Sequence, residues 1–213
     1  DVKAAVICVG HYRGLAPVRG LGAVDARLDG WISLAVRQGM IGGTLGETFY
    51  VPGAGRLGAG GVVIAGMGEF GTFNEDRLRI LMTNVAMGAG ALGIESFATL
   101  LVGAGDGNLG LDKVLRGLLN GIGIGLSNLL DETGKAPSLR EVTLVERDAA
   151  RFIDVMAQVE KLSQDGALPN VLLQFKKPTP GELARARKLA GARQQGPRSA
   201  SRSEMAAQPD SRE

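Results

Sequence analysis

Twice in this sequence an apolar run leads through a glycine loop into a stretch of helical spacing. Both loops have the form G-x-G-x-x-G; their glycines are Gly66, Gly68 and Gly71 in the first copy and Gly105, Gly107 and Gly110 in the second. A strand that is followed by a long helix is typical of a parallel βαβ unit with a right-handed crossover. The sequence therefore predicts an α/β fold with three layers, α/β/α.

The spacing of apolar residues places the other elements. Strands are expected at residues 3–9, 47–51, 61–65, 97–102, 141–145 and 171–175. Helices are expected at residues 21–38, 74–91, 111–130 and 148–163. Asn74 is a suitable N-cap for the second of these helices. Aromatic residues make up only 4% of the chain, so the core must consist mainly of aliphatic side chains and methionine.

Glycine loops at the start of helices are candidate phosphate-binding sites. Without a side chain the backbone can approach a ligand closely, and the helix N-terminus adds a partial positive charge. Two such loops at the carboxyl edge of one sheet would form a cleft of phosphate size. A nicotinamide or flavin site would also need an acidic residue about 20 residues further on, whereas Glu146 and Asp148 lie much farther along. Close packing of helix on strand is the alternative explanation for the same glycines.

Few residues of the chain are suited to metal or nucleophilic chemistry. His11 is the one histidine and Cys8 the one cysteine, which excludes a metal site built from several histidines or thiols. Cys8 lies inside the first apolar run and is expected to be a buried structural thiol. His11 follows that run, a good position for a site residue, although a histidine in a loop is commonly exposed to solvent. No catalytic residue and no metal ligand is assigned.

The composition changes at residue 176. Residues 1–175 carry a net charge of −3, whereas residues 176–213 carry nine Lys/Arg against four Asp/Glu, a net charge of +5. Apart from a short helical stretch at 182–192, the second segment cannot bury enough apolar surface to fold. We interpret it as a disordered basic linker or tail that follows a domain at 1–175. Weak nucleic-acid binding through this tail is an alternative, although no aromatic residues alternate with the basic ones.

The sequence also bears on location. A single cysteine suits a reducing compartment, and no apolar run is long enough to span a membrane. A cytoplasmic protein without membrane contact is therefore expected. The chain opens on Asp1 rather than on methionine, which is typical of a piece of a longer polypeptide.

Four segments carry a family resemblance: Gly20-Leu-Gly22-Ala-Val-Asp25, Leu28-Asp-Gly30, Gly43-Thr-Leu-Gly46-Glu47-Thr48 and Val62-Val-Ile-Ala-Gly66-Met-Gly68. They resemble the N-terminal domain of the leucyl, or cytosol, aminopeptidases, and the resemblance covers residues 1–165. That domain is similar in fold to the macro domains, which are ADP-ribose-binding modules. The resemblance therefore implies a macro-domain-like fold with a mainly parallel mixed sheet.

The resemblance also implies a function. The aminopeptidases hold their metal ions in a C-terminal domain, and its Asn-Thr-Asp-Ala-Glu-Gly-Arg motif does not occur in this chain. A non-catalytic accessory module is therefore implied, with a regulatory or interaction role. Its partner would be a downstream domain of the same polypeptide or another protein, and self-association is left open.

A ligand-binding role is the alternative that the macro-domain likeness implies. Gly20, Gly22 and the loop from Gly103 to Gly110 resemble the two ligand-contacting loops of macro domains. No resident cofactor is assigned, but ADP-ribose or another nucleotide is a candidate ligand. Where macro domains that bind ADP-ribose carry asparagines, this chain has His11-Tyr-Arg13, so hydrolysis of ADP-ribose is not expected.

Overall fold

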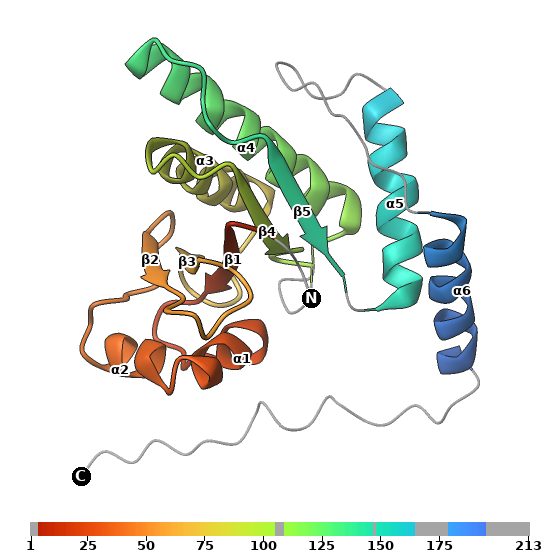
Figure 1. Ribbon diagram of the computed structural model, residues 1–213, viewed down its shortest axis with the longest axis horizontal. Helices are drawn as coiled ribbons and strands as arrows, with labels where there is room; N and C mark the ends of the chain where they lie inside the picture. Colours follow the sequence, from red (N-terminus) through yellow and green to blue (C-terminus); the bar gives the residue numbers. More distant parts are fainter. Residues whose placement is uncertain (1–3, 105–108, 147, 165–178, 195–213) are drawn as a thin grey trace.

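The structure, a computed structural model, describes residues 4–104, 109–146, 148–164 and 179–194. Its centre is a five-stranded sheet with the strand order β2-β3-β1-β4-β5 (Figure 1). The strands are β1 (Val6–His11), β2 (Thr48–Pro52), β3 (Gly61–Gly66), β4 (Ser96–Leu100) and β5 (Glu141–Val145). Only the edge strand β2 is antiparallel to its neighbour, and the other described pairs are parallel. The mainly parallel mixed sheet expected from the resemblance is confirmed.

Helices cover both faces of the sheet and bury a separate core on each. The helices α1 (Arg19–Arg27) and α2 (Trp31–Arg37) pack on one face, where their apolar side chains meet Val9 and Ile64 of the sheet. The helices α3 (Glu75–Ala91), α4 (Leu111–Thr133) and α5 (Ala149–Gln164) pack on the other face, around Cys8 and Phe97. The three layers are visible from the side in Figure 1. The predicted α/β/α architecture is therefore confirmed.

The two longest core helices, α3 and α4, approach each other through glycines of α4. A Cβ atom on Gly121 would lie 2.5 Å from the carbonyl oxygen of Arg79, and one on Gly125 would lie 2.4 Å from that of Thr83. Real Cβ atoms essentially never come this close, so α3 occupies the space that larger residues of α4 would need. Close packing thus explains glycines that lie inside a helix.

The sequence predicted one helix over residues 21–38, and this prediction is wrong. The chain leaves the helical conformation at Asp29 and Gly30, whose φ angles are 55° and 78°, and α2 begins anew at Trp31. The carboxylate of Asp25 accepts a hydrogen bond from the backbone N–H of Ser33 (3.1 Å) and another from its hydroxyl group. This side-chain bridge holds α1 and α2 at a turn that apolar periodicity alone does not reveal.

Other element ends differ by smaller amounts. The strand predicted at 3–9 is observed as Val6–His11, and the strand predicted at 97–102 is observed as Ser96–Leu100. The helix predicted at 111–130 runs on to Thr133 and ends at Gly134, which has a left-handed φ of 66°. Asn74 caps α3 as predicted, because its side chain accepts a hydrogen bond from the backbone N–H of Arg77 (3.0 Å). The strand predicted at 171–175 lies outside the described residues.

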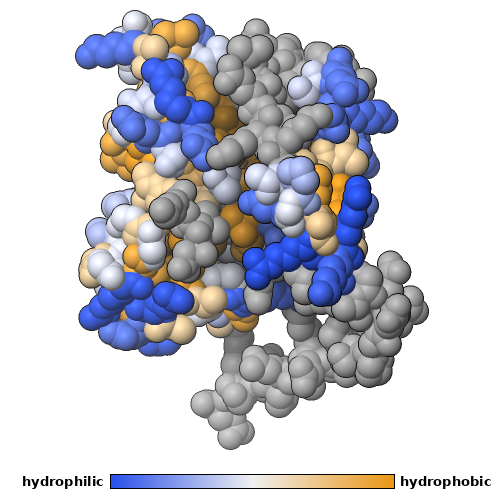
Figure 2. Space-filling view, turned by 45° about the vertical axis from the view of Figure 1, so that its right-hand side comes forward, coloured by the Kyte–Doolittle hydropathy of each residue, from blue (hydrophilic) through white to orange (hydrophobic). Residues whose placement is uncertain are grey.

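The last described element is α6 (Pro180–Gln194), which includes the short helix predicted at 182–192. It lies beside α5 (Figure 1). In the space-filling view, hydrophobic residues appear mostly in recesses between hydrophilic side chains (Figure 2). No helix within the described ranges is long and apolar enough to cross a membrane.

Candidate functional site

The connections of the sheet reverse at β1, the central strand. After β1 the chain passes to α1 and α2 on one face, whereas after β3 and β4 it passes to α3 and α4 on the other face. Since β1, β3 and β4 are parallel, their carboxyl ends lie at one edge of the sheet. A crevice opens where neighbouring strands send the chain to opposite faces, and ligands of open α/β sheets bind there. The end of β1 is therefore flanked by two candidate crevices.

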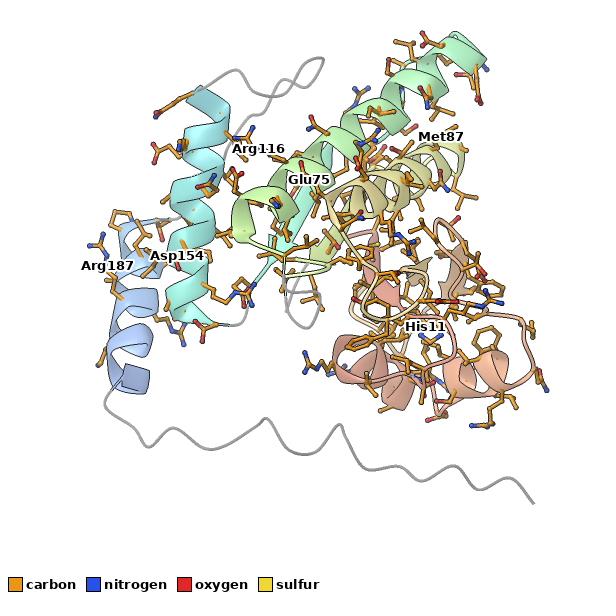
Figure 3. The ribbon with its side chains drawn as sticks, turned by 180° about the vertical axis from the view of Figure 1, so that it is seen from behind. His11, Glu75, Met87, Arg116, Asp154 and Arg187 are labelled. Atoms are coloured by element: carbon orange, nitrogen blue, oxygen red, sulfur yellow. The ribbon has the colours of Figure 1, made fainter. Side chains whose placement is uncertain are left out.

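His11 ends β1 and is almost completely buried, with only 3% of its surface exposed. The expectation of a solvent-exposed loop histidine is wrong, because the strand extends two residues beyond its predicted end. Side chains alternate along a strand, so His11 shares with Val9 the face covered by α1 and α2. Figure 3 labels it on that side of the sheet. Its Nε2 atom has no hydrogen-bond partner among the described residues.

Burial lowers the pKa of His11 from its usual value of 6.5, although the negative charge of Glu47 acts in the opposite direction. Removing an imidazolium from water is costly, so a buried histidine favours its neutral form. The backbone carbonyl of the same residue accepts a hydrogen bond from the N–H of Met67 (2.8 Å). His11 is thus a neutral group fixed at the start of the first glycine loop.

The segment 42–47 closes over the end of β3 and is held by its own carboxylate. Glu47 accepts hydrogen bonds from the backbone N–H groups of Gly42 (3.0 Å) and Thr44 (2.9 Å). A Cβ atom on Gly66 would lie only 1.9 Å from the carbonyl oxygen of Thr44. Gly66 is therefore required for packing in this structure. Close packing was the alternative to phosphate binding that the sequence left open for these glycines.

The first glycine loop directs the N–H groups of its first three residues, 66–68, to protein atoms. The N–H of Gly66 donates to the carbonyl of Glu47 (2.7 Å), and the N–H of Gly68 donates to that of Gly43 (2.9 Å). Further along, Gly71 has a φ of 83° and no atom within 4 Å of a Cβ position. Within the described part of the chain, the N–H groups of Glu69, Phe70 and Gly71 donate no hydrogen bond. Any contact of this loop with a ligand would thus involve its far end.

The second glycine loop flanks the other side of β1. Gly103 packs against Phe73, whose Cε1 atom is 2.7 Å from a Cβ position on the glycine. Gly110 precedes α4, and no atom of the described residues lies within 4 Å of a Cβ position on it. Gly105 and Gly107 lie outside the described residues.

The remaining predicted site residues lie near the same crevice. A Cβ atom on Gly20 would be 2.6 Å from Cδ1 of Leu100, so the beginning of α1 packs directly on the end of β4. Gly22 lies two residues further along α1, where a Cβ would be 3.1 Å from the carbonyl oxygen of Pro17. The structure therefore brings Gly20 to the β4 end, from which the second glycine loop departs.

Aromatic and basic side chains that sequence reasoning did not select also lie at this edge. Tyr12 makes an edge-on ring contact with Phe70, with centroids 5.1 Å apart, and Phe70 is 45% exposed. Arg13 and Arg77 border an open hollow of about 340 Å³ beside Gly68. Their positions in the sequence could have indicated them, because Arg13 follows the end of β1 and Arg77 lies in the first turn of α3.

Residue types that bind metal ions are dispersed in the part of the chain that the structure describes. Within the described ranges, no three His, Cys, Asp or Glu side chains are grouped closely enough to hold a metal ion. Cys8 is fully buried and its pKa is raised to about 12 by burial. Its burial agrees with the sequence prediction.

The strand order and the helical layers give an α/β fold similar to that of macro domains. A Trypanosoma brucei macrodomain in complex with ADP is similar, with a TM-score of 0.55 and 21% sequence identity, over 75% of this chain and 64% of that chain. A tomato leucine aminopeptidase mutant is similar with a TM-score of 0.52 and 16% identity, over 68% of this chain and 30% of the other. At such identities the likeness concerns the fold alone.

The sequence comparison is more specific. The family model described as "Cytosol aminopeptidase family, N-terminal domain" matches residues 8–122, and the chain belongs to this family. A "Probable cytosol aminopeptidase" of Alkaliphilus oremlandii (strain OhILAs) is 28% identical over 108 residues. That match covers 50% of this chain but only 22% of the relative. The family resemblance predicted from the glycine-rich segments is confirmed.

Proposed function

We propose that this chain is a non-catalytic accessory module of a larger polypeptide, with a regulatory or interaction role. The observation that carries the proposal is the extent of the family match. The matched model is that of the N-terminal domain, and the chain covers less than a quarter of its aminopeptidase relative. In this proposal the partner is a downstream domain of the same polypeptide or another protein.

The experiment that tests this proposal is an assay of the purified chain for turnover. Leucine peptides and an ADP-ribosylated protein would be offered in turn, each with and without added Mn²⁺ or Zn²⁺. We expect no product above the rate of a heat-inactivated sample. Turnover that purifies together with the chain would contradict an accessory role.

A second candidate function is the binding of ADP-ribose or another nucleotide in the crevice between β1 and β4. The start of α4 after Gly110 favours it, because the first N–H groups of a helix have no intrahelical acceptor and, together with the helix dipole, attract phosphate. The similar Trypanosoma brucei macrodomain is in complex with ADP. The candidate contacts are the glycines 103, 105, 107 and 110, with Gly20 and Gly22 opposite.

Thermal shift with ADP and ADP-ribose tests this second function, since a ligand that binds only the folded state raises the unfolding midpoint. The variant Gly110→Val would place side-chain carbons at the mouth of the crevice, and its Cβ would not conflict with any described residue. We expect it to abolish the shift. The matched control is Gly58→Val, also at an uncrowded position and outside this edge. A shift that persists in Gly110→Val would dismiss the crevice.

The remaining sequence predictions stay proposals. We propose a domain at residues 1–175 followed by a basic linker at 176–213, in a cytoplasmic protein. Arg185, Arg187 and Lys188 are exposed on α6, which is compatible with weak, salt-sensitive nucleic-acid binding by this segment. Truncation at residue 176 should remove such binding, whereas the crevice of the domain should keep its own ligands.

A further inference from the structure

The hollow beside Gly68 lies between the ends of β1 and β3, on the opposite side of β1 from the crevice discussed above. Arg13 contributes from the segment after β1, Thr44 from the segment before β2, and Arg77 from the first turn of α3. Gly68, Glu69 and Thr72 of the first glycine loop complete the polar lining. Its volume of about 340 Å³ is near the lower end of ligand sites, which hold roughly 300–1,000 Å³.

Two positively charged side chains, those of Arg13 and Arg77, line this hollow. Within the part of the chain that the structure describes, neither Arg13 nor Arg77 forms an ion pair. Glu69, the acidic residue of the lining, pairs with neither of them there. Arg77 donates a hydrogen bond to the hydroxyl oxygen of Thr72, which orients its guanidinium group and leaves further N–H donors for another acceptor.

Gly68 connects the two arginines. Its carbonyl oxygen accepts a hydrogen bond from the backbone N–H of Arg13 (2.9 Å). A Cβ atom at Gly68 would lie 3.3 Å from Nη1 of Arg77, and the residue has a left-handed φ of 76°. The absence of a side chain therefore lets the guanidinium group lie directly against the loop. This contact uses the glycine loop in a way that the sequence pattern did not suggest, since the N–H of Gly68 is already donated to Gly43.

We propose that this hollow is a binding site for the phosphate group of a small phosphate ester, held between the guanidinium groups of Arg13 and Arg77. Guanidinium groups present planar, fixed N–H donors that match the oxygen atoms of a phosphate. The hydroxyl group of Thr44 lies in the same lining and supplies a neutral donor, whereas that of Thr72 already donates to the carbonyl oxygen of Glu69 (2.8 Å). The site goes beyond the proposed accessory function and does not depend on the crevice between β1 and β4.

The test is a titration of the 213-residue chain with inorganic phosphate and with phenyl phosphate at constant ionic strength, followed by amide NMR shifts. We expect saturable shifts at Gly68 and Thr72 with both probes. The variants R13Q and R77Q should each weaken binding about tenfold, the cost of one charge-assisted hydrogen-bond pair. R79Q is the matched control, because Arg79 lies on the same helix, pairs with Asp76 at 3.2 Å and is outside the hollow.

Three results would overturn the proposal. The first is the absence of saturation with either probe. The second is shifts confined to Gly103 and Gly110, which would place the phosphate in the other crevice. The third is an affinity of R13Q that equals the affinity of the R79Q control. R13Q decides the matter even if R77Q fails to fold, because the side chain of Arg13 is exposed and makes no hydrogen bond within the described residues.

Discussion

At the scale of single residues, His11 has the environment least expected from the sequence. The sequence marked it as a site residue because it follows a strand, but a loop histidine would have been hydrated. Two additional residues of β1 place it instead under the α1 and α2 layer, with an Nε2 atom that has no partner within the described ranges. Strand ends are set by pairing with neighbours, here the register of His11 opposite Gly66, and such pairing is not visible in one strand's own sequence.

The pH dependence of stability should reflect this burial. The pKa of His11 is below 6.5 in the folded state, so below about pH 6.5 the unfolded chain binds a proton that the folded chain does not. The free energy of unfolding is therefore expected to be unaffected by His11 above that pH. It should fall as the pH drops from 6.5 through the pKa of His11 in the folded state. Urea unfolding measured at several pH values over this window should show that the free energy of unfolding depends less on pH in His11→Gln than in the wild type. NMR titration of the one histidine reports its pKa directly, and a value at or above 6.5 would contradict the account.

Cys8 should behave as an inert core residue. The thiolate is the reactive form, and burial raises the pKa of Cys8 to about 12. A disulfide reagent such as Ellman's reagent at mildly alkaline pH is expected to leave the folded chain unmodified and to titrate one thiol after unfolding in guanidinium chloride. Equal labelling rates for the folded and unfolded chain would show that the β1 core is not closed as described.

At the scale of elements, the sequence predicted existence and type better than ends. The strand at 141–145 and the helix start at Asn74 were predicted correctly because local signals define them, an apolar run in one case and a side-chain cap in the other. The break between α1 and α2 was missed because it depends on Asp25 reaching Ser33, a contact that no periodicity encodes. The sequence alone also did not explain the glycines inside α4, because their role depends on the close contact with α3.

The contact between α3 and α4 can be tested at one of these glycines. Gly121→Ala would push a methyl group into the backbone of α3 at Arg79, and overpacking of this kind costs typically about 1–3 kcal/mol. Gly88→Ala is the control, because its nearest neighbour is 4.0 Å away and alanine is favoured over glycine in a helix by up to about 1 kcal/mol. Urea unfolding should show destabilisation for the first and none for the second. A neutral Gly121→Ala would mean that α3 and α4 are farther apart.

At the scale of the whole molecule, the alternation of strands and glycine loops was sufficient for the layer architecture and, with four short segments, for the family. It was not sufficient for the candidate site. The loops were expected to offer N–H groups, but those of Gly66 and Gly68 bind carbonyl groups of the segment 42–47. The two arginines that border the hollow are brought together because the end of β1 and the start of α3 lie close in space. Spacing in the sequence does not reveal this proximity.

The accessory role that we propose for this member of the cytosol aminopeptidase family predicts that the chain does not itself hydrolyse peptides. Its most direct test is mass-spectrometric detection of free leucine after prolonged incubation of a leucine peptide with the chain and Mn²⁺ or Zn²⁺. The account predicts the same trace as for the peptide incubated with metal alone. Release of leucine in proportion to the amount of chain, through successive purification steps, would contradict it.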